Sequence, residues 1–319
     1  MTVADGAPGP QFAKRLEDGR RIAYDDIGPR DGFPVLLLHG TPGSRRGPRP
    51  RGIVLHRLGI RLITYDRPGY GDSDRFEGRN VADAAQDALA IVTELEIESF
   101  GIVGRSGGGP HALACGADEH LRDRITRIAV LVSLAPADAP GWYEGMNDDN
   151  AGTFGDAVDD TARLETEIRR RAKETIADPD YLLTLLGHQM TVADRQVVSD
   201  ASLRRELRMS YRDALKNGEE GWIDDVLALR REWKFDLGAV APPIKVWHGK
   251  DDTFAPVAHS AYLASALGRA ELDLRDGAAH FDAMPELPRI LRWLATPVSH
   301  DPEFRSPVAP AVGEGLLPV

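Results

Sequence analysis

A serine set among glycines is the clearest candidate for chemistry in this sequence. The stretch GIVGRSGGGPHALA matches the pattern Gly-x-Ser-x-Gly at residues 104–108, with Ser106 at its centre. A β-prone run precedes the match and a helix-prone run follows it, which is the setting of a nucleophile elbow. Gly104 and Gly108 leave room for the close approach of strand and helix that such a turn requires. The pattern therefore predicts that Ser106 projects from the edge of a sheet as a nucleophile.

The partners that a serine nucleophile needs are found later in the chain. A hydroxyl reacts when a base takes its proton and a third group orients that base. In proteins with a nucleophile elbow of this kind, the three residues follow along the chain in the order serine, acid, histidine. The segments HGKDDTFAP and RDGAAHFDAMP, each after a β-prone run, offer Asp252 as the acid and His280 as the base. Asp251 and, after an earlier strand, Asp138 are the alternative acids.

Two backbone donors are expected where the oxygen of a tetrahedral intermediate becomes negative. The N–H of Gly107, directly after the serine, is one. The loop HGTPGS offers the N–H of Thr41 as the other, because Pro42 has no N–H and the flanking glycines permit a sharp turn. A simple turn after a buried strand is the alternative interpretation of this loop.

Short apolar runs that alternate with helical patterns indicate a mainly parallel sheet flanked by helices. The predicted strands, eight in all, cover 12–16, 21–25, 34–38, 61–65, 100–103, 125–134, 244–247 and 271–274. Helices are predicted at 81–95, 108–117, 255–267 and 285–294. The carboxyl ends of parallel strands meet at one edge, so this arrangement would bring the serine, acid and histidine together.

Between the strands predicted at 125–134 and 244–247, the alternation of strands and helices stops. Only helices are predicted there, at 160–177, 180–186, 202–216 and 222–232. We therefore predict an α/β fold with a mainly parallel, eight-stranded twisted sheet and an inserted helical cap. The domain boundaries expected are a core at 1–137 and 242–299, a cap at 138–241, and a Pro- and Gly-rich tail at 300–319. Trp142, Tyr143 and Met146 lie where the cap begins, and we expect them to contact substrate; packing between cap and core is the alternative.

Composition excludes several other classes of function. A formal net charge of −11 and a pI near 5.3 argue against binding to nucleic acid or to an anionic membrane surface. The single cysteine, Cys115, is expected to be a small buried filler and excludes an internal disulfide. Without an apolar run of about 20 residues or a signal peptide, we expect a cytoplasmic protein. No metal or cofactor motif is present, so we expect neither a metal nor a cofactor, and a small-molecule substrate as the partner.

Taken together, the motifs HGTPGS, DRPGYGDSD, GRSGGGP, HGKDD and GAAHF resemble the α/β-hydrolase superfamily, in its serine-nucleophile branch with a helical cap. The resemblance extends from the opening hairpin to the last helix. It implies a Ser106–Asp252–His280 triad with Thr41 and Gly107 as oxyanion donors. Branches of the superfamily that open epoxides or remove halides carry an aspartate at the elbow, so the serine disfavours those reactions.

The resemblance also implies that Asp66 and Arg67 of DRPGYGDSD are structural support for the oxyanion loop. Beside the nucleophile, Arg105 is an unusually large cation, which either binds an anionic group or forms a surface or ion-paired arginine. The expected function is a serine hydrolase that cleaves a carboxylic ester or lactone of a small-to-medium apolar molecule. The alternatives are an amide hydrolase of the prolyl aminopeptidase type, because HGTPG is similar to the HGGPG box of that branch, and a ligand-binding protein without turnover.

Overall fold

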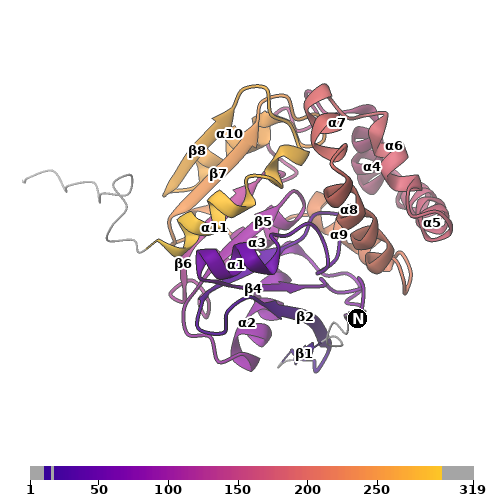
Figure 1. Ribbon diagram of the computed structural model, residues 1–319. Helices are drawn as coiled ribbons and strands as arrows, with labels where there is room; N and C mark the ends of the chain where they lie inside the picture. The colour runs from indigo at the N-terminus through magenta and orange to yellow at the C-terminus, as the bar shows by residue number, and fades with distance from the viewer. Residues whose placement is uncertain (1–10, 16–17, 297–319) are drawn as a thin grey trace, which may run out of the picture.

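One eight-stranded sheet forms the centre of the computed structural model, which describes residues 11–15 and 18–296 (Figure 1). The strands run β1-β2-β4-β3-β5-β6-β7-β8 across the sheet, and β2 is antiparallel to both of its neighbours while the remaining pairs are parallel. Their bounds are Gln11–Lys14 (β1), Arg21–Ile27 (β2), Phe33–Leu38 (β3), Ile60–Tyr65 (β4), Phe100–Arg105 (β5), Ile125–Leu131 (β6), Ile244–Gly249 (β7) and Ala270–Arg275 (β8). The sequence-based prediction of an α/β fold with eight strands is confirmed. The tail at 300–319, the amino-terminal ten residues and part of the first turn lie outside the described residues.

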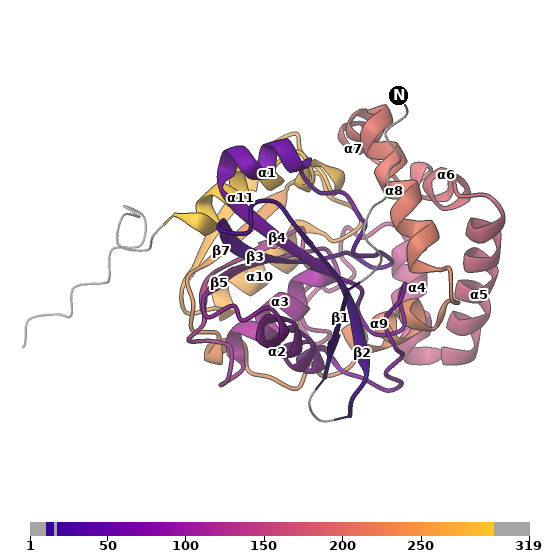
Figure 2. The ribbon, with the colours of Figure 1, turned by 60° about the horizontal axis from the view of Figure 1, so that its bottom comes forward.

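Both faces of the sheet are covered by helices, as the unbroken apolar run in β3 requires. In that strand Val35 and Leu37 pack against α1 (Gly52–Leu58) and α11 (Leu287–Ala295) on one face. The opposite face is covered by α2 (Ala84–Glu94), α3 (Gly108–Ala117) and α10 (Val257–Ala266), and Figure 2 shows α1 with α11 on the other side of the sheet from α2 with α3.

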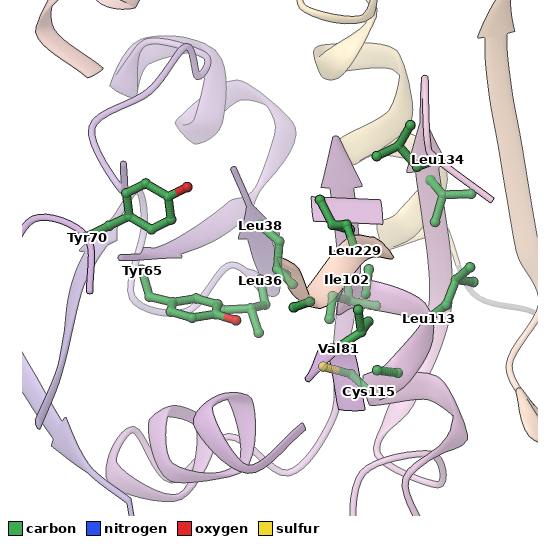
Figure 3. Close-up of a cluster of buried hydrophobic side chains, with 14 of the residues drawn as sticks. Leu36, Leu38, Tyr65, Tyr70, Val81, Ile102, Leu113, Cys115, Leu134 and Leu229 are labelled. Atoms are coloured by element: carbon green, nitrogen blue, oxygen red, sulfur yellow. The ribbon is translucent and has the colours of Figure 1, made fainter. Parts of the chain in front are cut away.

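The second face holds the larger apolar core (Figure 3). Leu36 and Leu38 of β3 and Ile102 of β5 meet Leu113 and Cys115 of α3, and all five side chains are buried. Cys115 is therefore the small buried filler that the sequence predicted. This core fixes α3 against the strand that precedes it, which is the junction that carries Ser106.

Six helices are inserted between β6 and β7, and α4 to α8 lie together beyond the sheet in Figure 1. They are α4 (Asp148–Asp159), α5 (Thr161–Ala177), α6 (Tyr181–Gly187), α7 (Val192–Val198), α8 (Ala201–Ala214) and α9 (Glu220–Arg230). Two of them, α4 and α7, were not predicted, and neither was α1. Helix α4 buries Phe154 alone among its side chains and contains two glycines, so its sequence shows little helical pattern. The limits of a cap domain at 138–241 stay a prediction.

No helix in the described ranges is both long and apolar enough to span a lipid bilayer.

Candidate active site

Ser106 occupies a strained turn between β5 and α3. Its φ of 54° lies in the left-handed region, which residues other than glycine seldom adopt. A Cβ atom added to Gly104 would lie 2.2 Å from the carbonyl oxygen of Gly108, and one added to Gly108 would lie 2.5 Å from that of Leu38. The two glycines are therefore required by close backbone contacts, as the elbow pattern predicted.

Asp252 and His280 meet beyond the ends of β7 and β8. The Nδ1 atom of His280 donates a hydrogen bond of 2.8 Å to Oδ2 of Asp252. The other carboxylate oxygen accepts from the backbone N–H groups of Phe254 and Ala255 at 2.8 and 3.0 Å. Asp251 is exposed. The geometry thus selects Asp252 as the partner of His280.

His248, at the end of β7, supports the same carboxylate. Its Nε2 atom lies 3.3 Å from Oδ2 of Asp252 and 2.7 Å from the carbonyl oxygen of Ala255, while Nδ1 contacts the Ser260 hydroxyl at 2.6 Å. Burial acts to raise the pKa of Asp252, but the facing His280 and the hydrogen bonds from both histidines outweigh burial and hold that pKa below its ordinary value. Asp252 is therefore a carboxylate at neutral pH, able to orient a neighbouring imidazole. Asp138, the third candidate acid, is exposed at a different pocket.

Four of the predicted site residues line a single cavity of about 90 Å³: Thr41, Ser106, Gly107 and His280. The cavity lies between the carboxyl edge of the sheet and the inserted helices. Among the described residues, no hydrogen bond joins the Ser106 hydroxyl to the imidazole of His280. The fold thus brings Ser106 and His280 to one small cavity from positions far apart in the sequence.

Thr41 and Gly107 lie side by side at the wall of this cavity. A Cβ atom added to Gly107 would be 2.3 Å from the Thr41 hydroxyl oxygen. In the described part of the chain, neither backbone N–H has a hydrogen-bond acceptor. The carbonyl of Gly107 instead accepts from Nδ1 of His111 at 2.7 Å, so this buried histidine supports the elbow and does not line the cavity.

Asp225, on inserted helix α9, fixes the Thr41 side of the site. Its Oδ2 atom accepts hydrogen bonds from the hydroxyls of Thr41 at 2.7 Å and Tyr70 at 3.0 Å. Arg67 and Arg79 form buried ion pairs with the same carboxylate. Burial works to raise the pKa of Asp225, but the two arginines prevail and hold it well below its usual range. A buried charge cluster therefore fastens the helical insertion to the loop that carries Thr41.

Arg67 continues this support into the main chain. It donates to the carbonyl oxygens of His39 and Gly40, and its own N–H donates to Nε2 of His39 at 3.2 Å. Asp66 is equally buried and accepts from the backbone N–H of Arg45 at 2.7 Å. These contacts confirm the supporting positions predicted for Asp66 and Arg67. Sequence reasoning missed Asp225, since no motif surrounds it.

The apolar wall of the cavity comes from different inserted residues than the sequence suggested. It is formed by Phe154, Leu182, Leu186, Trp222 and Val226, together with Phe254 and Phe281 from the sheet loops. Trp142, Tyr143 and Met146, which the sequence suggested as substrate contacts, do not line this cavity.

Local packing explains why these residues lie outside the cavity. The indole N–H of Trp142 donates to the carbonyl of Ala135 at 2.9 Å, and its ring packs edge-on against Phe154. Met146 is buried in the core, and Tyr143 is 39 % exposed. The alternative interpretation, packing between insertion and core, describes Trp142 and Met146.

No group of three or more His, Cys, Asp or Glu side chains in the described ranges is arranged to hold a metal ion. The polar groups at the cavity are instead a strained serine, a histidine paired with a carboxylate, and two backbone N–H groups without an acceptor among the described residues.

Comparison with known proteins agrees with this geometry. The family model described as the alpha/beta hydrolase fold matches residues 34–287. The AB hydrolase superfamily protein YisY of Bacillus subtilis (strain 168) is 28 % identical over 81 % of this chain and 88 % of its own length. The bifunctional esterase/perhydrolase DCH of Acinetobacter calcoaceticus is 31 % identical over 75 % of this chain and 82 % of its own. An esterase structure from Exiguobacterium antarcticum, 20 % identical, superimposes with a TM-score of 0.66 over 90 % of this chain and 99 % of that one.

The chain belongs to the α/β-hydrolase fold family. It is an enzyme of the hydrolase kind, in the branch whose elbow carries a serine.

Proposed function

We propose that the protein is a serine hydrolase that cleaves carboxylic esters or lactones of small molecules through an acyl-enzyme. The observation that carries the proposal is the strained Ser106 in one cavity with His280, whose imidazole is held by Asp252. A cavity of about 90 Å³ favours a small substrate. The esterase name of a relative with 31 % identity supports the same reaction class.

In the proposed mechanism, Nε2 of His280 accepts the proton of Ser106 as the serine oxygen attacks the substrate carbonyl. The N–H groups of Gly107 and Thr41 donate to the oxyanion, and Asp252 stabilises the imidazolium. His280 then gives its proton to the leaving alcohol. Water, deprotonated by the same histidine, attacks the acyl-enzyme and releases the acid and Ser106.

Covalent labelling tests the nucleophile directly. A fluorophosphonate probe should label the wild-type protein at Ser106, and the Ser106→Ala variant should show neither labelling nor turnover, with kcat reduced by about 10⁶-fold. Ser199 is exposed on the insertion, so the Ser199→Ala variant is the matched control and should label like the wild type. Labelling at another residue, or full activity in Ser106→Ala, would refute the mechanism.

A substrate panel distinguishes the remaining alternatives. Acyl esters and lactones should be hydrolysed, whereas amides with an amino-terminal proline should not. Preferential cleavage of the proline amides would establish the peptidase alternative. Labelling of Ser106 with no turnover of any panel member would favour the ligand-binding alternative.

A further inference from the structure

Among the described residues, Arg105 lacks the carboxylate partner that other arginines near the site possess. Arg45, Arg67 and Arg79 are buried, and each faces an aspartate carboxylate. Arg105 is partly buried at the end of β5, and within residues 11–15 and 18–296 it has neither a carboxylate partner nor a hydrogen-bond acceptor. Removing a charge from water is costly when no opposite charge faces it. This guanidinium is therefore suited to an anion that the described part of the chain does not supply.

The guanidinium lies beside the nucleophile. Arg105 lines the same cavity as Ser106. A Cβ atom built on Gly40, in the oxyanion loop, would be 3.4 Å from Cβ of Ser106 and 3.6 Å from Nη2 of Arg105. Both side chains therefore border one small region of the cavity wall. Of the interpretations that the sequence left open for Arg105, an ion pair is excluded within the described residues.

Tyr211, on α8, is a second unused donor at this wall. Its side chain is buried and lines the cavity, and its hydroxyl has no hydrogen-bond partner in the described part of the chain. Burial raises the pKa of Tyr211 to about 12, so the phenol keeps its proton at neutral pH and remains a donor. Tyr211 is also the ionisable group within electrostatic reach of Arg105.

The other charges at the cavity are compensated. Among its described lining residues Asp149 is the only carboxylate, and Arg171 binds it through two hydrogen bonds of 2.6 and 2.8 Å. His280 is held by Asp252. Arg105 thus gives the cavity an uncompensated positive charge, and the surrounding apolar side chains strengthen its attraction for an anion.

We infer that Arg105 and Tyr211 bind a carboxylate of the substrate, so that the substrate class is an ester or lactone bearing a free carboxylate a few bonds from the scissile carbonyl. The inference rests on the proposed acyl transfer at Ser106 and narrows it. A planar guanidinium donates two parallel N–H groups to a carboxylate, and a phenol adds a third bond. When the carboxylate is masked as a methyl ester, these donors lose their charged acceptor.

A pair of matched substrates tests the inference. Ethanol release is measured from monoethyl glutarate and from ethyl methyl glutarate, which differ in the free carboxylate. In the wild type kcat/KM should be about 10- to 100-fold higher for monoethyl glutarate. The Arg105→Gln variant should lose most of this preference, Arg105→Lys should recover part of it, and Tyr211→Phe should reduce it by about 3- to 10-fold.

The matched control is Arg122→Gln, which removes the same charge from an exposed site in the loop between α3 and β6. Its preference should equal that of the wild type. A wild-type enzyme without preference for the carboxylate, or an Arg105→Gln variant that keeps the wild-type preference, would overturn the inference. The ratio of two substrates is insensitive to a general loss of folded enzyme, so a merely structural role of Arg105 would leave it unchanged.

A binding measurement separates this inference from the proposed function. In the Ser106→Ala background, calorimetry should detect glutarate binding that the additional Arg105→Gln substitution weakens by about 10-fold or more. Absence of fluorophosphonate labelling would refute the acyl-transfer mechanism. Glutarate binding measured by calorimetry would still test the anion site in that case. Labelling and ester turnover without an Arg105-dependent glutarate affinity would refute the anion site alone.

Discussion

The two sides of the cavity are held by different kinds of interaction. On the sheet side, the elbow is fixed by steric contact between backbones, since Gly104 and Gly108 leave no space for a Cβ atom. On the insertion side, polar side chains reach across to the sheet loops. Asp225 binds Thr41 from α9, and Asp194 of α7 accepts a 2.8 Å hydrogen bond from the N–H of Phe281, next to His280.

This difference indicates that the inserted helices do more than cover the cavity. They bind the loops that carry the proposed oxyanion donor and base, so a change in the insertion is expected to affect both stability and turnover. Changes at the elbow should act through packing instead. Matched substitutions on the two sides, taken here from the largest expected effect to the smallest, test this contrast.

The largest effect is expected from Asp252→Asn on the sheet side. The amide no longer stabilises the protonated His280, so kcat should fall by about 10⁴-fold in steady-state ester hydrolysis. Asp251→Asn, at the adjacent exposed position, should retain wild-type kcat. A similar loss in both variants would show that this loop does not depend on the Asp252–His280 contact.

Asp225→Asn should be the most damaging polar change in the insertion. It leaves Arg67 and Arg79 buried without a counter-charge, and the free energy of unfolding should fall by about 3–5 kcal/mol. The neighbouring Asp224→Asn is the control, because Asp224 pairs with Arg75, whose side chain is 40 % exposed; about 1 kcal/mol or less is expected. Urea titration measures the free energy of unfolding of both variants. Equal losses would contradict the inference that Asp225 holds the buried charge cluster together.

Glycine-to-alanine substitutions should have opposite signs on the two sides. Gly104→Ala places Cβ 2.2 Å from a backbone oxygen and should destabilise the fold by about 3 kcal/mol. Gly152→Ala in α4 meets no atom within 4 Å and should stabilise it by about 0.5–1 kcal/mol, since alanine favours a helix. Thermal melting of the two variants measures the contrast, and destabilisation by Gly152→Ala would show that α4 is packed more tightly than the structure indicates.

The smallest effect is expected in the pH dependence of stability. The pKa of Asp252 is lowered in the folded state, so its ionisation stabilises the fold above about pH 4, and this contribution is lost as the pH falls further. Burial raises the pKa of Asp194, so its contribution is present below about pH 4 and is lost as the pH rises.

Unfolding measured from pH 3 to 8 tests these signs. Relative to wild type, Asp252→Asn should become less stable as the pH rises, whereas Asp194→Asn should become more stable. The asparagine at 194 can still accept from the N–H of Phe281, which isolates the ionisation from the hydrogen bond. Parallel pH profiles for the two variants would contradict the opposite directions of the pKa shifts of Asp252 and Asp194.

The structural features that depend on local backbone geometry could be predicted from the sequence. Gly104 and Gly108 predicted the elbow because strand, turn and helix are consecutive in the chain, and the apolar run of β3 predicted a strand covered on both faces. Helix α4 was not predicted, because it buries a single side chain and its sequence contains glycines. The residues suggested as substrate contacts at the start of the insertion do not line the cavity for a related reason: nearness to the start of the insertion does not determine which side chains face the sheet.

By itself, the sequence determined the fold class, the elbow and the order of serine, acid and histidine, because parallel strands bring the residues after their ends to one edge. Only the tertiary structure showed that Asp252 contacts His280 while Asp251 is exposed, and only it joined Asp225 to Thr41 across 184 positions. It also left Arg105 at the cavity without a partner among the described residues. The physical reason is that pairing and burial depend on which surfaces of distant segments pack together. No pattern within a short stretch of residues contains that information.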